Sequence, residues 1–315
     1  MLDLYEELFL PDHQGPMLHQ SVRNGVRLIM EAGGTLPEVA LLFTDRDFLK
    51  TRLAESQDPW VRHYFNWVWG KMSESSKGEY LAYFTSKLSS FIEDRMLRNI
   101  LGQRDGVDLG EFLSGGGILL ANLARGTIGD LNSRLLGMIL LHKLERATLE
   151  RSSLEQNERN PVNIYVDEFH EFCTNSLVKF LGAARKFKVG LTLAHQRLET
   201  LRPVIQEAIM GGVGHFLMFR QGAGEGLLAL PSLVWPRFGE RELLRLPNFH
   251  TIARVTGTDG RGRLGRLKIP GPSQGSGMTA LRVRQLSWEQ FARPRVQVEA
   301  EMLERLGWDP GEGKE

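Results

Sequence analysis

Residues 163–172 read NIYVDEFHEF, and this stretch decides the fold. The apolar run Ile164–Val166 leads directly into two carboxylates, Asp167 and Glu168. A short apolar run that ends in polar residues is typical of a strand buried in a sheet. The stretch therefore predicts a strand whose carboxyl end presents two acidic side chains.

A second strand follows at a spacing that pairs it with the first. Residues 189–194 form another strand-like run, Gln196 follows within two residues, and residues 176–188 between the strands carry helical periodicity. Strand, helix and strand in this order form a βαβ unit, whose parallel strands end at the same edge. Ligands of open α/β sheets bind at that edge. We therefore expect Asp167, Glu168 and Gln196 to lie together there.

These residue types suit nucleotide hydrolysis. One carboxylate can hold the water shell of Mg²⁺, a second can polarise the attacking water, and a neutral amide can sense the γ-phosphate. An apolar strand that ends in Asp-Glu has the form of a Walker B motif. The alternative is a solvated strand end, in which the carboxylates only face water. The position of Gln196 on the next strand favours the nucleotide site.

The same residues carry a family resemblance. NIYVDEFHEF, followed by ARKFKVGLTLAHQ at residues 184–196, resembles the DNA-pumping ATPases of the conjugative coupling-protein (TraG/TraD-like) and HerA/FtsK group. In that group a Walker B strand, an Arg-bearing helix and a Gln-ended strand follow in this order. The segments around 115–144, 210–230, 244–255 and 287–301 look similar as well, so the resemblance covers roughly residues 15–300.

The resemblance implies a fold and a set of roles. The fold is α/β, with a RecA-like P-loop NTPase core and an N-terminal all-α domain, and the cofactors are ATP and Mg²⁺. Asp167 would hold Mg²⁺ through water, Glu168 would polarise the attacking water, and Gln196 would contact the γ-phosphate. Arg185, at the end of the intervening helix, matches a trans-acting arginine finger, or it only offsets the helix dipole. Arg220, after a later strand, is a weaker candidate for nucleotide binding.

One element of that family is missing from these residues. No GxxxxGK[ST] string, the Walker A loop, occurs among the 315 residues, so the P-loop core is incomplete. We expect the catalytic (Walker B, sensor, arginine-finger) portion of an ATP-driven DNA translocase of the type IV secretion or conjugative transfer kind, as a fragment or split product that is inactive alone. The alternative is a non-catalytic interaction module that docks to an intact ATPase ring or a relaxosome; an unrelated α/β enzyme is a third possibility.

The expected partners follow from these hypotheses. They are DNA, further copies of the chain in a hexameric ring or an intact subunit that supplies Walker A, and relaxosome or secretion-system proteins. A finger at Arg185 would reach a neighbouring subunit rather than its own strand ends, so that role itself implies an oligomer.

Composition limits the class of protein. A chain of 315 residues with 42% hydrophobic and 24% charged residues has ample core for one or two domains, and its net charge of +1 excludes a globally basic nucleic-acid binder. One cysteine, Cys173, permits no intrachain disulfide. With no signal peptide and no apolar run near the roughly 20 residues that span a bilayer, we expect a cytoplasmic protein, held at a membrane only through a partner.

The pattern predicts three parts: a helical domain at 1–110, the RecA-like core at 111–270, and a linker with a helical tail at 271–315. In the first part, Asp45 and Asp58 have the positions of helix N-caps. Residues 60–69, rich in Trp, Tyr and Phe, give one helix a thick aromatic face, which indicates core packing rather than stacking on single-stranded bases. In the core, residues 118–122 are expected to form a further strand.

Overall fold

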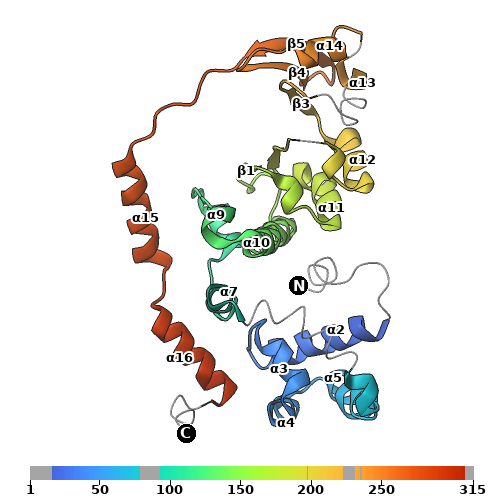
Figure 1. Cartoon of the computed structure of the whole chain (residues 1–315), viewed down its shortest axis with the longest axis vertical. Coiled ribbons are helices and arrows are strands. Elements are labelled where there is room, and N and C mark those ends of the chain that lie inside the picture. Colours follow the sequence, from blue (N-terminus) through green and yellow to red (C-terminus); the bar gives the residue numbers. More distant parts are fainter. Residues whose placement is uncertain (1–15, 79–92, 197, 223–230, 235, 309–315) are drawn as a thin grey trace. The chain divides into compact units, whose positions relative to one another are not determined.

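The computed structural model describes residues 16–78, 93–196, 198–222, 231–234 and 236–308. The chain divides into two compact units, one formed by residues 1–108 together with 281–315 and the other by residues 109–280 (Figure 1). This division places the C-terminal residues with the N-terminal helices, although some 170 residues of chain separate them.

The regular secondary structure described in the first unit is all helical. Its helices are α2 (Pro16–Glu31), α3 (Glu38–Thr44), α4 (Arg46–Glu55), α5 (Pro59–His63), the π-helix Tyr64–Trp69, α7 (Arg95–Leu101) and α16 (Arg295–Leu306). The two predicted caps are confirmed. Asp45 accepts hydrogen bonds from the backbone N–H groups of Asp47 and Phe48, and Asp58 does the same at the start of α5, which satisfies donors that a helix leaves open.

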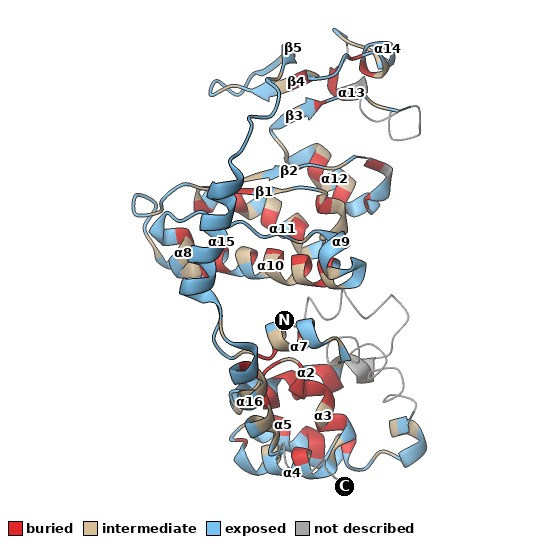
Figure 2. Cartoon of the chain, turned by 60° about the vertical axis from the view of Figure 1, so that its left-hand side comes forward, coloured by how far each residue is buried: buried red, intermediate tan, exposed pale blue. Residues whose placement is uncertain are grey.

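Aromatic side chains build the core of this unit, where Figure 2 shows buried residues along α2 and α3. The ring of Phe43 lies 5.0 Å from Trp69 in an edge-to-face arrangement and 5.9 Å from Phe65. Tyr64 is also buried, and its hydroxyl lies 2.6 Å from the hydroxyl of Ser21. Part of the predicted aromatic face is thus core, as the helical periodicity indicated.

Helix α16 docks onto this unit through both apolar and charged contacts. Val298 and Met302 are buried. Arg95 donates to both carboxylate oxygens of Glu299, at 2.7 and 2.9 Å. The side chains of Arg305 and Glu38 form a second pair at 2.8 Å, and this pair is almost completely buried. Residues far apart in the sequence therefore share one core.

The second unit contains both strands and helices. Its elements are α8 (Leu109–Gly115), α9 (Arg125–Ile128), α10 (Asp130–Glu150), β1 (Val162–Val166), α11 (Asn175–Ala184), β2 (Val189–Leu193), α12 (Pro203–Gly212), β3 (His215–Met218), α13 (Pro231–Val234), α14 (Glu240–Leu244), β4 (His250–Thr256) and β5 (Gly262–Lys268). Helix α15 (Gly277–Phe291) connects it to the first unit and has no buried residue.

The predicted βαβ unit is confirmed. Strands β1 and β2 pair in parallel, from Val162 opposite Val189 to Val166 opposite Leu193, with α11 as the crossover. Ile164 faces a core that α10, α11 and α12 share. The opposite face of β1 is open, and Tyr165 there is 74% exposed. Parallel strands are normally covered by helices on both faces. The described part of this unit provides no layer over the face of β1 that carries Tyr165.

The remaining strands form a separate antiparallel sheet in the order β3, β4, β5. Strands β4 and β5 form a hairpin, with Gly260 at a positive φ of 74° in its turn. Ile252 and Met218 turn toward a second core formed with α13 and α14. Strand β3 is thus hydrogen bonded to β4 and not to the β1–β2 pair.

One predicted strand is wrong. Residues 118–122 are extended but make no ladder, and Ile118 and Leu120 are 87% and 76% exposed. An isolated segment gains no inter-strand hydrogen bonds, so apolar composition alone does not make it a strand. Within the described ranges, no helix has the length and apolar character that crossing a bilayer requires.

Candidate functional site

The carboxyl ends of β1 and β2 bring the three central candidates together. The backbone continues to pair past the strands, because Ala194 N donates to Val166 O at 2.9 Å and Phe169 N donates to Ala194 O at 3.1 Å. These bonds hold the two connecting turns side by side. Gln196 Nε2 then donates a hydrogen bond to Glu168 Oε1. The structure therefore places these side chains together at one edge of the sheet, as the sequence predicted.

Glu168 occupies a strained backbone conformation. Its φ of 47° and ψ of 43° lie in the left-handed region, which is uncommon for a residue with a Cβ and costs roughly 1–3 kcal/mol. Its N–H donates to Asp167 Oδ1 at 3.0 Å, so each acidic residue helps to position the other. Such strain persists where the surrounding contacts over-determine a conformation, and it is concentrated at functional sites.

A chain of charged and polar groups continues from Glu168 along the following 3₁₀ turn, Phe169–Glu171. His170 Nδ1 lies 3.4 Å from Glu168 Oε2, and its Nε2 lies 3.0 Å from Glu171 Oε1. Glu171 in turn pairs with Arg125 at the start of α9. No role in the site was predicted for these three residues, although His170 and Glu171 stand inside the motif and Arg125 follows the segment 118–122.

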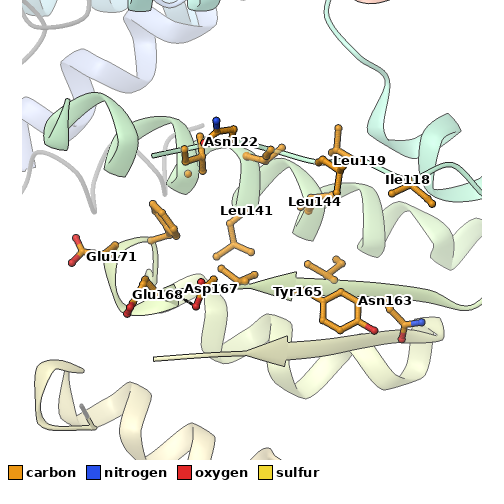
Figure 3. A pocket seen from close by; sticks show the side chains of 18 of the residues that line it. Ile118, Leu119, Asn122, Leu141, Leu144, Asn163, Tyr165, Asp167, Glu168 and Glu171 are labelled. Carbon is orange, nitrogen blue, oxygen red and sulfur yellow. Dashed lines mark hydrogen bonds between the residues drawn. The ribbon is translucent and has the colours of Figure 1, made fainter. Parts of the chain in front are cut away.

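An open cavity of about 1460 Å³ lies beside this edge, between β1 and the segment 116–125 (Figure 3). Asp167, Glu168 and Glu171 gather at one end of it. Ile118 and Leu119 lie across from β1 farther along, with Asn122 near the acidic end, so the segment runs in the same direction as the strand. The cavity exceeds the 300–1,000 Å³ of an ordinary ligand pocket.

The donor set at this end fits the water shell of a magnesium ion better than it fits phosphates. Exposed and half-buried carboxylates with a neutral amide beside them are the oxygen ligands and water acceptors that Mg²⁺ prefers. Glu168 Oε2 is a buried oxygen without a hydrogen bond, so both of its lone pairs are open. Arg125 is the one cationic residue along the described lining, and it already pairs with Glu171. The described lining therefore carries oxygen groups of the kind that the water ligands of Mg²⁺ prefer, although the described residues include no cluster of three or more His, Cys, Asp or Glu that could ligate a metal ion directly.

Arg185 does not join this cluster. It is exposed at the end of α11, where Lys188 N donates to Arg185 O and Val162 N donates to Lys188 O. That position is the amino edge of the sheet. A five-residue strand is about 16 Å long, so Arg185 and Asp167 are separated by roughly that distance along β1. Arg185 thus lies away from the carboxyl ends of β1 and β2 in its own chain, as the sequence predicted.

Arg220 is not brought to the site either. It is exposed and follows β3, whose hydrogen-bonded neighbour is β4 in the antiparallel sheet. Among the residues that the structure describes around the cavity, Arg220 is not part of the lining. Its predicted contact with a nucleotide has no support in this geometry, because β3 pairs with β4 and not with the parallel strands β1 and β2.

Comparison by sequence identifies no relative, since neither a protein-family model nor a curated protein matches the chain. Comparison by structure finds a similar fold. The fold is similar to that of the plasmid coupling protein TrwB, solved in complex with ADP and Mg²⁺, with a TM-score of 0.53 at 11% sequence identity. The match covers 87% of this chain and 68% of the TrwB chain. At that identity the likeness shows the fold alone: the chain has a mixed helix-and-strand fold like that of a plasmid coupling protein.

Proposed function

We propose that this chain contributes the magnesium and water side of an ATP-hydrolysing site in a DNA translocase of the conjugative transfer kind, built on a RecA-like core. The observation that carries the proposal is the juxtaposition of Asp167, Glu168 and Gln196 at the carboxyl edge of a parallel strand pair. The TrwB fold supports it, because the solved TrwB structure holds ADP and Mg²⁺.

The roles follow from the contacts. Asp167 is the exposed carboxylate and would accept hydrogen bonds from the water ligands of Mg²⁺. Glu168 accepts the proton of the attacking water; Gln196 occupies one lone pair of its Oε1 and leaves the second free. On the other side, His170 Nδ1 lies 3.4 Å from Glu168 Oε2, and Glu171 Oε1 lies 3.0 Å from His170 Nε2, so the imidazole stands against the carboxylate before substrate arrives. When bound, Mg²⁺ neutralises charge that develops on the phosphates.

The phosphate side of the site must come from outside these 315 residues. No GxxxxGK[ST] loop is present in them, and the described lining offers no unpaired cation for a γ-phosphate. The open face of β1, with Tyr165 uncovered, offers a place for a further layer of structure. We infer that a P-loop-bearing segment, covalently joined or separate, completes both the sheet and the site.

Arg185 then acts on a neighbouring site. Its position at the amino edge, about 16 Å from Asp167, suits a residue that serves another subunit and not its own. Within this proposal the working assembly is a ring, of six subunits by the family resemblance, that moves DNA.

Steady-state ATP hydrolysis tests the proposal. The purified chain alone should turn over far below about one ATP per second, the lower end of ordinary enzyme rates. Mixed with the P-loop-bearing polypeptide of the same transfer system, it should show Mg²⁺-dependent hydrolysis that DNA stimulates. Asp167→Ala and Glu168→Gln should each lower that rate by roughly 10²-fold or more, by analogy with other lost transition-state contacts.

Glu150→Gln is the matched control, since it makes the same carboxylate-to-amide change on the exposed end of α10. It should leave the rate unchanged. If the two polypeptides associate and no hydrolysis appears, the chain is an interaction module and the catalytic proposal fails. Full activity of Glu168→Gln would also overturn it.

A further inference from the structure

One edge of strand β1 has no partner strand in the part of the chain that the structure describes. β1 pairs with β2, and this ladder begins at Val162 N, which donates to Lys188 O at 3.0 Å. A parallel strand bonds to its neighbour through every second residue. Asn163 and Tyr165 therefore direct their N–H and C=O groups away from β2. These four backbone groups form a free edge.

The free edge opens on the cavity described above. All five residues of β1 line this cavity, whereas none of the β2 residues 189–193 does. Figure 3 shows Leu141 and Leu144 of α10 beside the strand, with Ile118 and Leu119 across from it. Backbone groups that face apolar side chains cost free energy unless hydrogen-bond partners reach them. A ligand that brings N–H and C=O groups of its own would therefore be stabilised here.

The side chains of β1 do not protect this edge. Residues 162–166 read VNIYV and include no charged residue and no proline. Edge strands that avoid further pairing usually carry a charge or a proline, or lie beneath a helix or loop. The segment 116–125 stands opposite the edge but forms no ladder with it. β1 thus keeps the properties of a template for one more strand.

We propose that the free edge of β1 binds an extended peptide segment of a partner protein, which adds a strand alongside Asn163 and Tyr165. In this mode of recognition, main-chain hydrogen bonds supply affinity and the pockets for alternate side chains supply specificity. The cavity of about 1460 Å³ exceeds the roughly 300–1,000 Å³ of a small-molecule pocket and follows the whole strand. The edge and the cavity are together called the strand site below. The strand site does not rest on the proposed function, because it needs neither nucleotide nor P-loop.

The two faces of the strand site predict an alternating peptide. Successive side chains of a strand point to opposite faces of its sheet. On the face that carries Ile164, the peptide would meet the leucines of α10, since Ile164 and Leu141 share one core. On the other face it would lie beside Asn163 and Tyr165, whose side chain is 74% exposed. A segment that alternates apolar and polar residues satisfies both faces.

Charge predicts which end of the peptide is basic. Asp167, Glu168 and Glu171 gather at one end of the cavity, and Arg125 is the one Lys or Arg along the described lining. Three carboxylates against one guanidinium leave this end negative. A lysine or arginine at the matching end of the peptide is therefore favoured, whereas the phosphates of a nucleic acid would be repelled. The strand site thus fits a peptide and not a nucleic acid.

Binding of a synthetic peptide tests the proposal. The probe is fluorescein-labelled Gly-Thr-Val-Thr-Val-Thr-Val-Lys-Lys amide, whose valines suit the apolar wall and whose lysines reach the acidic end in a parallel strand. Fluorescence anisotropy without ATP or Mg²⁺ should give a Kd below about 1 mM. Replacing both lysines by glutamine should weaken binding at least about 2-fold, since each exposed ion pair contributes about 1.4- to 5-fold.

Tyr165→Pro tests the backbone contact itself. It removes an N–H that faces the peptide and leaves the bonds between β1 and β2 in place. Tyr165→Thr is the matched control, because it also removes the phenol ring but keeps the N–H. One lost hydrogen bond costs about 2- to 13-fold in affinity, and the pyrrolidine ring also blocks the approach of a strand. With both variants folded by circular dichroism, the proline variant should bind at least about 5-fold more weakly than the threonine variant.

Hydrogen exchange of the parent chain gives a readout that needs no variant. Peptide at about ten times its Kd should slow exchange of the amide protons of Asn163 and Tyr165 by about 10-fold, because only the peptide-free chain opens them to water. The amide of Leu191 points away from β1, on the far edge of β2, and is the control. It should keep its exchange rate.

Three results would overturn the proposal. The first is a Kd weaker than about 1 mM for the peptide. The second is equal affinity for the proline and threonine variants, which would place the peptide away from the edge of β1. The third is self-association that Tyr165→Pro abolishes and the peptide does not reduce, because the edge then joins copies of this chain. No measurement involves ATP, so the strand site and the proposed function fail separately.

Discussion

Replacing Arg305 by methionine tests how α16 is held to the N-terminal helices. Arg305 Nε donates to Glu38 Oε1 at 2.8 Å, and its Nη2 donates to the carbonyl oxygen of Gly102 at 2.6 Å. The two side chains are only 8% and 4% exposed. Methionine keeps much of the hydrocarbon of the side chain, so the change removes mainly the guanidinium and its bonds.

The expected loss of folding stability follows from the Glu38 carboxylate, which stays buried without its partner. Glu38 Oε2 already lacks a hydrogen bond, and without Arg305 the carboxylate keeps only Thr35 Oγ1 as a donor, at 3.0 Å. Removing one partner of a buried ion pair costs about 3–5 kcal/mol, because an uncompensated charge stays out of water. For a unit of this size, 3 kcal/mol lowers the melting temperature by roughly 6–12 °C.

Circular dichroism at 222 nm and chemical denaturation of the intact chain measure this effect. In the background of Glu38→Gln, which removes the buried charge, Arg305→Met should cost at least about 1 kcal/mol less, since the two residues interact directly. Arg295→Met is the control: it makes the same change on the same helix at a 63% exposed side chain and should change stability by less than about 0.5 kcal/mol.

The reasoning fails if Arg305→Met unfolds like the parent chain. It also fails if the effects of the two single changes simply add, because additivity means that the pair does not interact. Either result would show that the Arg305–Glu38 pair does not hold α16 to the N-terminal helices.

Two further predictions concern the ring and the pH dependence of stability. In the complemented ATPase, Arg185→Ala and Glu168→Gln should each silence hydrolysis, and mixing the two variants should restore part of it, because a finger and its site lie on different subunits. Steady-state rates of mixed and unmixed rings measure this recovery. If folded variants show no recovery when mixed, Arg185 is only a charge at the end of its helix. Hydrogen bonds from Arg95 and Asn99 lower the pKa of Glu299 from its ordinary 4.5 to about 2. A carboxyl whose pKa is lower in the folded state contributes stability above about pH 4.5 that is lost as the pH falls toward 2. In Glu299→Gln the free energy of unfolding should therefore fall less steeply between those two pH values. Urea titrations at several pH values measure this, and an unchanged slope contradicts the lowered pKa of Glu299.

The sequence alone determined the local elements and the sheet edge that matters. The periodicity of residues 163–196 sets strand, helix and strand, and the right-handed parallel crossover leaves one arrangement in which Asp167, Glu168 and Gln196 meet. Asp45 and Asp58 were readable as caps because a cap is a local hydrogen bond. Such features need no information from distant parts of the chain.

Tertiary structure decided which surfaces are covered and which distant groups meet. Residues 118–122 have strand composition, but a strand forms only where a partner edge lies within hydrogen-bonding distance. The pairing of Arg305 with Glu38 joins residues 267 positions apart, which no periodicity encodes. In the same way, Trp60 and Trp67 carry the same helical spacing as the buried aromatic residues, and only packing leaves these two in water. Local pattern specifies the faces of an element, whereas its neighbours in space determine which face is buried.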